Sequence, residues 1–397
     1  MAGLPPPGDP VRTRPLPAGA VSEPEGTGAP AGPGPAGPEP QPGPGPAGPG
    51  SQPGPGLPAG VTAGHWTDPV GRTGCTVVLT PGGAVAGVDV RGAAPGTLGT
   101  DALRPGTLVE RAHAILLTGG SAFGLGAATG VLRYLDEHDA GFAIGTVRVP
   151  IVAGAVIFDL LTGDPRAWPD ADAGYAACQA ASSDPVSGQV GAGTGATVAK
   201  AAGGLPRPGG AGIVTARAGA ATVSAIMVAN SVGGIWDDDR HRWLAPLPAQ
   251  SPGTHEGPVN DENPGSDQDP RTDQAPGTHQ AGTDQAPGTH QAGADQAPAA
   301  RQPQGPGPLP GANTTIGVVA TDAELTREQA NRIATVAHDG IARAVRPAHT
   351  RYDGDSLFCL ATGRVPADEA LPDEIEAAAA ELVARAIARA VRRAAAG

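Results

Sequence analysis

Apolar residues concentrate in two stretches of the chain, 61–248 and 313–397, and are scarce elsewhere. In the first stretch, short apolar runs such as TVVL, AVAGVDV, AILL and VPIVAGAVIF are bounded by Gly, Pro and Asp, a pattern typical of buried strands. GIVTARAG and ATVSAIMVANSVG predict two paired strands, the second of which ends at Asn230. Helical patterns occur in groups around these strands, which predicts an α+β fold with helices layered around packed sheets.

Local signals divide the first stretch further. Pro81-Gly82-Gly83 predicts a turn between the strands TVVL and AVAGVDV. Gly119-Gly120 predicts a second turn, after which Ser121 is placed to cap a helix. The buried face of that helix is predicted from apolar residues at helical spacing: Leu125, Ala128, Leu132 and Leu135.

The second stretch begins with NTTIGVVATDA, which predicts a buried strand. The helix that follows carries a capping box formed by Thr326 and Gln329. Its predicted buried face consists of Ala330, Ile333, Ala337 and Ile341. A final helix is predicted over about 373–395, with an apolar side formed by Ile375, Val383, Ile387 and Val391.

Composition separates these stretches from two others. Residues 1–60 and 249–312 are rich in Pro and Gly and lack the apolar side chains that would offset chain entropy, so we predict a disordered tail and a disordered linker. The linker contains two 11-residue copies of a DQAPGTHQAG repeat. His255, His279 and His290 lie in its GTH triplets and are open to interpretation as a metal-binding tract, but their wide spacing and the lack of Cys favour a repeat-expanded linker.

The charge balance excludes some partners. The net charge is −13, and no basic patch with interleaved aromatic residues is present, which argues against nucleic-acid binding. No apolar run reaches membrane-spanning length, and the first residues do not resemble a signal peptide. Cys75, Cys178 and Cys359 are odd in number and widely spaced, so we expect buried free thiols and a cytoplasmic location.

The pair Asn313-Thr314 stands where the linker meets the strand. If the backbone were cut there, Thr314 would carry both a hydroxyl and a free α-amine, whose usual pKa is near 7.7–8.0. Such an amine can act as the base for its own hydroxyl, and the hydroxyl can make the cut by attacking the Asn313 carbonyl. The alternative is an ordinary turn that leads into a strand, because Asn is common in turns and Thr in strands.

Seven segments occur in a characteristic order: GHWTDPVGRTGCTVVL, LLTGGSAFGL, VPIVAGAVIFDL, GAGTGATVAK, VANSVGGIWD, NTTIGVVATDA and HTRYDGDSLFCLATG. Together they resemble the family of L-aminopeptidase/D-esterases, which includes β-peptidyl aminopeptidases and nylon-oligomer hydrolases. The resemblance covers nearly all of 61–248 and 313–397. It implies a four-layer α/β/β/α sandwich like that of N-terminal-nucleophile hydrolases, with different connectivity.

The resemblance also implies a precursor that cuts itself between Asn313 and Thr314. Residues 61–248 then form the large-chain part of one hydrolase domain and 313–397 the small-chain part. Thr314 matches the family nucleophile, and the expected substrates are small peptides, amino-acid amides or amino-acid oligomers. The resemblance further implies a homo-oligomer of processed two-chain units, and it implies no cofactor and no metal.

Four further residues match family positions. Asn230 matches the oxyanion-hole asparagine, a role that a carboxamide at a strand end can fill. Lys200 matches a lysine near the nucleophile, although a lysine after a Gly-rich loop is also commonly just solvated. Asp353 and Asp355 match the pair that orients the nucleophile. On a strand they would face the same side and raise one another's pKa, whereas in isolation Asp-Gly-Asp also fits a surface loop.

The sequence departs from the family pattern at Phe158, where several relatives have a tyrosine, so Asn230 is expected to carry more of the oxyanion hole. The Thr nucleophile and the Asp-Gly-Asp pair place the chain near the nylon-oligomer-hydrolase branch. Two alternatives remain at this point. One is acyl transfer of the ornithine acetyltransferase type, and the other is a non-catalytic binding or scaffold protein with long tails.

Overall fold

The computed structural model describes residues 56–201, 205–248 and 313–396. The folded part begins before the boundary predicted at residue 61. Leu57 is buried in the core, and its N–H donates a hydrogen bond of 2.8 Å to the Ser183 carbonyl. The repeat and its three histidines lie outside the described residues.

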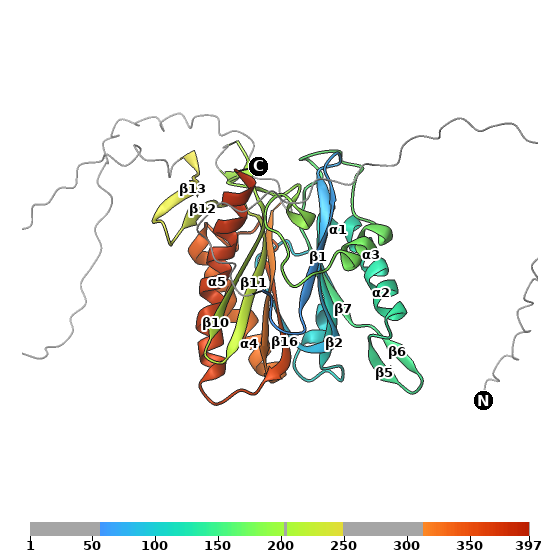
Figure 1. The fold of residues 1–397 in the computed structure, drawn as a ribbon. Helices are drawn as coiled ribbons and strands as arrows, with labels where there is room; N and C mark the ends of the chain where they lie inside the picture. The colour runs from blue at the N-terminus through green and yellow to red at the C-terminus, as the bar shows by residue number, and fades with distance from the viewer. Residues whose placement is uncertain (1–55, 202–204, 249–312, 397) are drawn as a thin grey trace, which may run out of the picture. The chain divides into compact units, whose positions relative to one another are not determined.

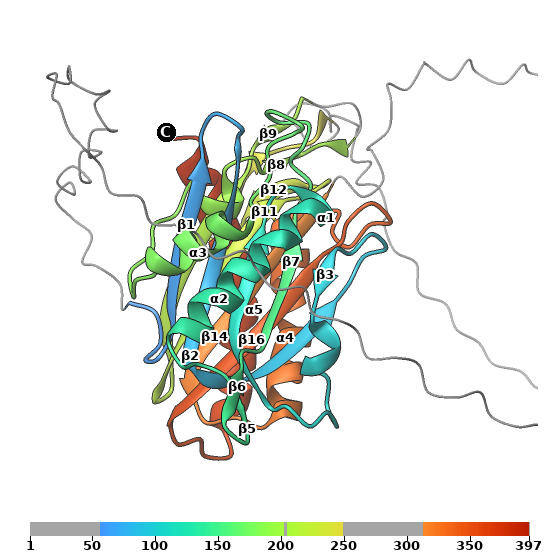
Figure 2. The same cartoon turned by 90° about the vertical axis from the view of Figure 1, so that its right-hand side faces the viewer.

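The chain is arranged as four layers, helix, sheet, sheet and helix, which are seen edge-on in Figure 1. Nine strands form one continuous hydrogen-bonded sheet, which folds at β2 into two facing layers, termed the first and the second sheet. The first sheet contains β1 (Thr62–Asp68), the first half of β2 (Thr73–Val90), β4 (Arg111–Thr118), β7 (Val152–Val156) and β3 (Thr97–Leu98). The second sheet contains β10 (Gly210–Ala218), β11 (Ala221–Asn230), β14 (Thr314–Ala323), β16 (Ser356–Val365) and the second half of β2. Helices α2 (Ala128–Glu137) and α3 (Ala171–Gln179) cover the first sheet (Figure 2), and α4 (Arg327–Ala344) and α5 (Leu371–Ala394) cover the second.

Shorter elements complete the fold. They are η1 (Thr100–Leu103), α1 (Ser121–Gly124), η2 (Leu125–Ala127), β5 (Phe142–Ile144), β6 (Val147–Val149), η3 (Gly191–Gly193), β8 (Thr197–Val198), β9 (Arg207–Pro208), β12 (Gly234–Asp237), β13 (Arg242–Ala245) and β15 (Val345–Arg346). Among the helices of the described ranges, none has the length and apolarity needed to cross a membrane.

Strand alternation produces the layers. In β14, Ile316 and Val318 point into the core between the sheets, whereas Val319 points toward α4 and α5. In β16, Phe358 likewise joins the core between the sheets and Cys359 the helix side. Both sheets are therefore buried on both faces, which explains why their strands read as continuous apolar runs. The three cysteines are buried free thiols, as expected.

The prediction of a turn at Pro81-Gly82-Gly83 is wrong. These residues lie inside the single long strand β2, at an irregularity where the pairing with β4 shifts between Leu79 and Ala84. Gly83 takes a φ of 76°, which a glycine adopts without steric cost. The irregularity allows β2 to belong to both sheets: residues 73–79 pair with β1, residues 85–90 pair with β16, and β4 pairs with β2 on both sides of the irregularity.

Two details of the first helical region also differ from expectation. Ser121 does not cap a helix, because it is the first residue of α1 and its side chain makes no capping bond. Leu132 is exposed, and Val131 occupies the buried face in its place with Ala128 and Leu135. The segment begins as a short helix and a 3₁₀ turn, which rotates the later residues relative to a single continuous helix.

The second stretch follows its predictions. Helix α4 carries the capping box of Thr326 and Gln329, and its four predicted apolar residues are fully buried. Helix α5 buries Ile375, Val383 and Ile387 against the second sheet. The amphipathic pattern determined these helices because each has one sheet to cover.

Candidate active site

Thr314 is the first residue of β14, at the end of the second sheet. Strand alternation places it on the same face as Ile316, toward the core between the sheets. Its register partner on β11 is Asn230, the last residue of that strand. Both are buried, with 3% and 0% of their surface exposed. The two residues proposed for nucleophile and oxyanion hole are thus adjacent because two strands end side by side.

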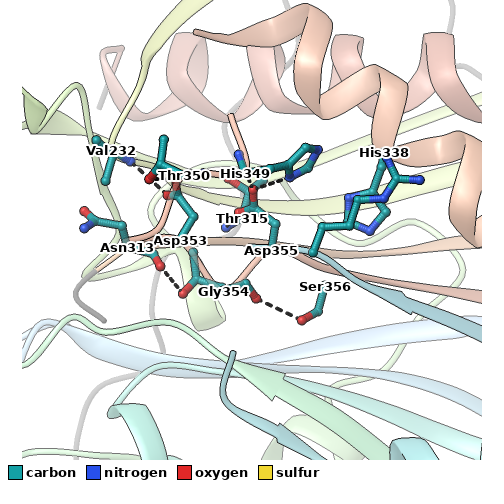
Figure 3. Close-up of polar contacts among 12 residues, drawn as sticks. Val232, Asn313, Thr315, His338, His349, Thr350, Asp353, Gly354, Asp355 and Ser356 are labelled. Atoms are coloured by element: carbon teal, nitrogen blue, oxygen red, sulfur yellow. Dashed lines mark hydrogen bonds and ion pairs between the residues drawn. The ribbon is translucent and has the colours of Figure 1, made fainter. Parts of the chain in front are cut away.

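The carbonyl group of Asn313 is held by two donors. The Thr314 hydroxyl donates to this carbonyl oxygen, and the Gly354 N–H donates to it at 3.1 Å. Figure 3 shows Gly354 beneath Asn313, in the loop that precedes β16. The Thr314 hydroxyl therefore lies directly against the peptide bond that self-cleavage would break. The Gly354 N–H is placed where it would stabilise charge that develops on that oxygen.

Asn230 is fixed at both ends of its carboxamide. The Thr197 N–H and the Lys200 ammonium group both donate to its Oδ1 at 3.0 Å. Its Nδ2 donates to the Phe158 carbonyl at 3.3 Å. Because the oxygen is held by two donors, the N–H₂ end is the end directed toward β7 and the space between the sheets. The contact with position 158 is through its main chain and does not depend on the missing phenol.

Lys200 lies beside this asparagine rather than in open solvent. Its Nζ also donates to the Asn230 main-chain carbonyl at 3.1 Å. Burial lowers the pKa of Lys200 to about 7, against the attraction of the Asp353 and Asp159 carboxylates. Lys200 therefore changes charge near neutral pH beside Asn230, the register partner of Thr314, and a shifted pKa of this kind is a common property of catalytic groups.

The Gly-rich segment before Lys200 packs tightly against other backbone, as its glycines predict. A Cβ on Gly193 would lie 2.1 Å from the Ala211 nitrogen, and one on Gly195 would lie 2.2 Å from the Arg72 carbonyl oxygen. This close packing brings the Thr197 N–H to Asn230.

Asp353 and Asp355 lie in the loop before β16, as Asp-Gly-Asp also allowed, but both are buried rather than on the surface. Asp353 forms a bridge with Asn313 and accepts bonds from the Thr350 N–H at 3.0 Å and the Val232 N–H at 3.3 Å. Burial, followed by the nearby Asp355 carboxylate, raises the pKa of Asp353.

Asp355 contacts Thr315, the residue that follows Thr314. Its Oδ1 accepts the Thr315 N–H at 2.6 Å, and its Oδ2 accepts the His349 Nδ1–H at 2.7 Å (Figure 3). The carboxylate is 1% exposed. It therefore links the main chain of β14 to the loop that carries His349.

The fold brings all five predicted site residues, Lys200, Asn230, Thr314, Asp353 and Asp355, to one end of the second sheet. Sequence reasoning missed His349, Gly354 and Asp159. Asp159 is buried next to Lys200 and accepts the Thr73 hydroxyl at 2.8 Å and the Gly120 N–H at 2.7 Å. His349 and Asp159 lie within the quoted segments HTRYDGDS and VIFDL, but neither has a spacing that marks a role.

Comparison with known proteins identifies the type of enzyme. The family model described as peptidase family S58 matches residues 59–396. An uncharacterized aminopeptidase of Mycobacterium leprae is 39% identical over 362 residues, covering 84% of this chain and 88% of the relative. The 6-aminohexanoate-oligomer endohydrolase of Kocuria sp. is 29% identical over 307 residues, covering 77% of this chain and 74% of the relative.

Solved structures share the fold. A Burkholderia sp. beta-aminopeptidase matches with a TM-score of 0.55 at 21% identity, covering 86% of this chain and 88% of the other. The L-aminopeptidase D-Ala-esterase/amidase of Ochrobactrum anthropi, a variant of the N-terminal-nucleophile hydrolase fold, matches with a TM-score of 0.56 at 18% identity, covering 85% of each chain. The four-layer fold expected from the sequence is confirmed.

Proposed function

Because the chain belongs to peptidase family S58 and is a hydrolase of the aminopeptidase type, we propose that it cuts itself between Asn313 and Thr314 and then uses Thr314 as nucleophile. The observation that carries the proposal is the contact between the Thr314 hydroxyl and the Asn313 carbonyl oxygen. The mature enzyme then consists of residues 1–313 and 314–397, with parts of one domain in both chains.

Self-cleavage begins when the Thr314 oxygen attacks the Asn313 carbonyl carbon. The hydroxyl proton passes to the leaving amide nitrogen, and the peptide bond is replaced by an ester. The Gly354 N–H, 3.1 Å from the carbonyl oxygen, stabilises the negative charge formed in this step. Water then hydrolyses the ester, which releases the Asn313 carboxylate, restores the Thr314 hydroxyl and leaves Thr314 with a free α-amine.

Substrate hydrolysis repeats this chemistry with an external amide. The Thr314 amine takes the hydroxyl proton as the oxygen attacks the substrate carbonyl, and it returns that proton to the leaving amine. The Asn230 N–H₂ stabilises the oxyanion, and Lys200 adds positive charge when it is protonated. Asp353 and Asp355 hold the segments on either side of the cut. Water releases the acyl group and regenerates the hydroxyl.

We assign the enzyme to substrates with a free amino end, either small peptides and amino-acid amides or oligomers of an amino acid. The relatives named as aminopeptidases and as 6-aminohexanoate-oligomer endohydrolases support these two classes. Purified enzyme incubated with aminoacyl p-nitroanilides and with linear 6-aminohexanoate oligomers separates them by which product forms. The family match does not favour acyl transfer or a non-catalytic scaffold.

Intact mass under denaturing conditions tests the proposal. Wild type is expected to give two chains split at Asn313-Thr314, and Thr314→Ala to give one uncut, inactive chain. Thr315→Val is the matched control, because Thr315 lies on the next position of β14 and keeps its N–H bond to Asp355. Wild type that stays uncut on long incubation contradicts the self-cleavage mechanism.

Two further properties belong to this proposal. Three buried free thiols support a cytoplasmic location. The hairpin of β5 and β6 exposes Ile144 and Val147, each 59% exposed, which supports a homo-oligomer that covers it. Light scattering of wild type beside Ile144→Lys/Val147→Lys tests the oligomer, and an unchanged mass would show that the hairpin is not its contact.

A further inference from the structure

His349 is placed unusually for a residue without an assigned role. It lies in the loop between β15 and β16, and its main-chain φ is 53°, in the left-handed region where non-Gly residues are uncommon and Asn, Asp and His are the most frequent of them. Two of its groups donate to the same oxygen. The main-chain N–H lies 3.2 Å from Asp355 Oδ2 and the ring Nδ1 lies 2.7 Å from it. The residue thus holds one carboxylate oxygen with both its backbone and its side chain.

The other oxygen of this carboxylate reaches the nucleophile's own strand. Asp355 Oδ1 accepts the N–H of Thr315, the peptide group that directly follows Thr314. A continuous series of hydrogen bonds therefore runs from His349 through Asp355 to the main chain of the nucleophile. Thr315 and Asp355 are almost fully buried, so the carboxylate is shielded from the water that would otherwise weaken these bonds.

A second histidine from α4 supports the first from behind. The ring of His338 lies 5.0 Å from that of His349 at 63°, an edge-to-face contact. His338 Nε2 lies 3.1 Å from the Asp89 carbonyl oxygen, which only accepts, so the proton of this ring is on Nε2. Burial lowers the pKa of His338 to about 4, so this ring is neutral near neutral pH.

No other hydrogen bond competes for the His349 ring in the part of the chain that the structure describes. Its Nε2 is buried without a hydrogen-bond partner there, as is Nδ1 of His338. The charged groups around the two rings are Asp355, Asp89 and Arg91. Within the described residues, the ring of His349 therefore forms its hydrogen bond with Asp355.

We propose that His349, supported by His338, is a positioning residue that fixes Asp355 against the Thr315 amide and thereby aligns the Thr314 nucleophile. It contacts neither the scissile carbonyl nor Thr314, and it acts through Asp355 alone. The inference rests on the proposed role of Thr314. The bond between the Thr315 N–H and Asp355 can nevertheless be measured without any substrate turnover.

Two substitutions distinguish loss of the side-chain donor from disturbance of the backbone, because both Gly and Asn tolerate the left-handed conformation. His349→Gly removes the ring donor, and His349→Asn places a side-chain N–H₂ near the former Nδ1. His138→Gly is the matched control, because this histidine also bonds through Nδ1, to the Tyr134 carbonyl, but it follows the end of α2, the helix that covers the first sheet. Each purified full-length variant is compared with wild type by circular dichroism, kcat, KM and amide hydrogen exchange at Thr315.

We expect His349→Gly to lower kcat by roughly 10- to 100-fold with little change in KM, since a small displacement of a reacting group has effects of this size. Exchange at the Thr315 amide should become faster in the same variant, and His349→Asn should restore both properties. Wild-type exchange in His349→Gly, or equal losses in the Gly and Asn variants, overturns the proposal. A wild type without hydrolase activity refutes the proposed function, while the exchange measurement still decides the role of His349.

Discussion

The two sheets of the sandwich are alike in architecture and different in chemistry. Each is covered by two helices on its outer face, and both contribute apolar side chains to the core between them. The second sheet carries the proposed nucleophile Thr314 and its partner Asn230 at the ends of adjacent strands. The first contributes the Phe158 carbonyl and the Asp159 carboxylate, which follow β7.

The pairing of β14 within the second sheet shows how a chain cut at Asn313-Thr314 could remain a single domain. Strand β14 begins at the proposed cut and pairs with β11 on one side and β16 on the other. After the proposed cut, β11 would belong to the large chain, and β16 would belong to the small chain with β14. Cleavage at Asn313-Thr314 would break neither ladder, so the new amine would stay in the site. The first sheet supplies the opposite wall of the site and is not cut.

The largest effect should come from Asn230→Ala in the second sheet. Loss of an oxyanion donor lowers kcat by about 10²–10³-fold in well-studied hydrolases, and we expect a loss of that size here. Steady-state kinetics on the best p-nitroanilide measures it, with circular dichroism to show that β11 still forms. A loss below about fivefold would mean that another group provides the oxyanion hole.

Asp159→Asn tests the contribution of the first sheet. Its effect on kcat should be smaller than that of Asn230→Ala. Asn keeps an acceptor for the Gly120 N–H but removes the charge that attracts Lys200, so the pKa of Lys200 should fall further. A fall of about one unit reduces its protonated fraction at pH 8 by about tenfold. The pH profile of kcat should move to lower pH, with a loss of about tenfold or less at pH 8. A loss of kcat as large as that of Asn230→Ala would contradict the assignment of the main catalytic groups to the second sheet.

Lys200→Met should lower activity and raise stability. Burial lowers the pKa of Lys200 from 10.5 to about 7, so the unfolded chain holds a proton between these values that the folded chain lacks. The cost to the folded state is therefore complete below pH 7 and disappears as the pH rises toward 10.5. The variant should have a lower kcat and a higher Tm than wild type at pH 7, with a smaller Tm difference at pH 10. A Tm difference that grows with pH would contradict the assigned direction.

The smallest effect is expected from His338→Gln, which keeps a donor for the Asp89 carbonyl but does not titrate. The pKa of His338 falls from 6.5 to about 4 on folding, so wild type should lose stability as the pH decreases through this window. The Tm of the variant should fall less than that of wild type between pH 7 and pH 5. Equal falls would show that His338 is not responsible.

The sequence by itself determined the strands and helices of the second half and the identity of the proposed nucleophile. Amphipathic periodicity fixes α4 and α5, and the abrupt change from linker to strand marks Asn313-Thr314. The predicted turn at Pro81-Gly82-Gly83 was wrong because a local signal cannot show that β2 continues into a second sheet. Pairing with β16, far away in the chain, overrides the local preference for a turn.

Only the tertiary structure decided which groups surround Thr314. Asp159 reaches Lys200 because β7 and the Gly-rich loop meet across the sheet interface, and Gly354 reaches Asn313 because one loop bridges to the start of β14. His338 and His349 meet because α4 packs behind that loop. Such contacts join residues with no fixed spacing in the chain, so periodicity and motif carry no signal for them. Tertiary packing sets the distances between these residues, and their burial shifts the pKa values on which the chemistry depends.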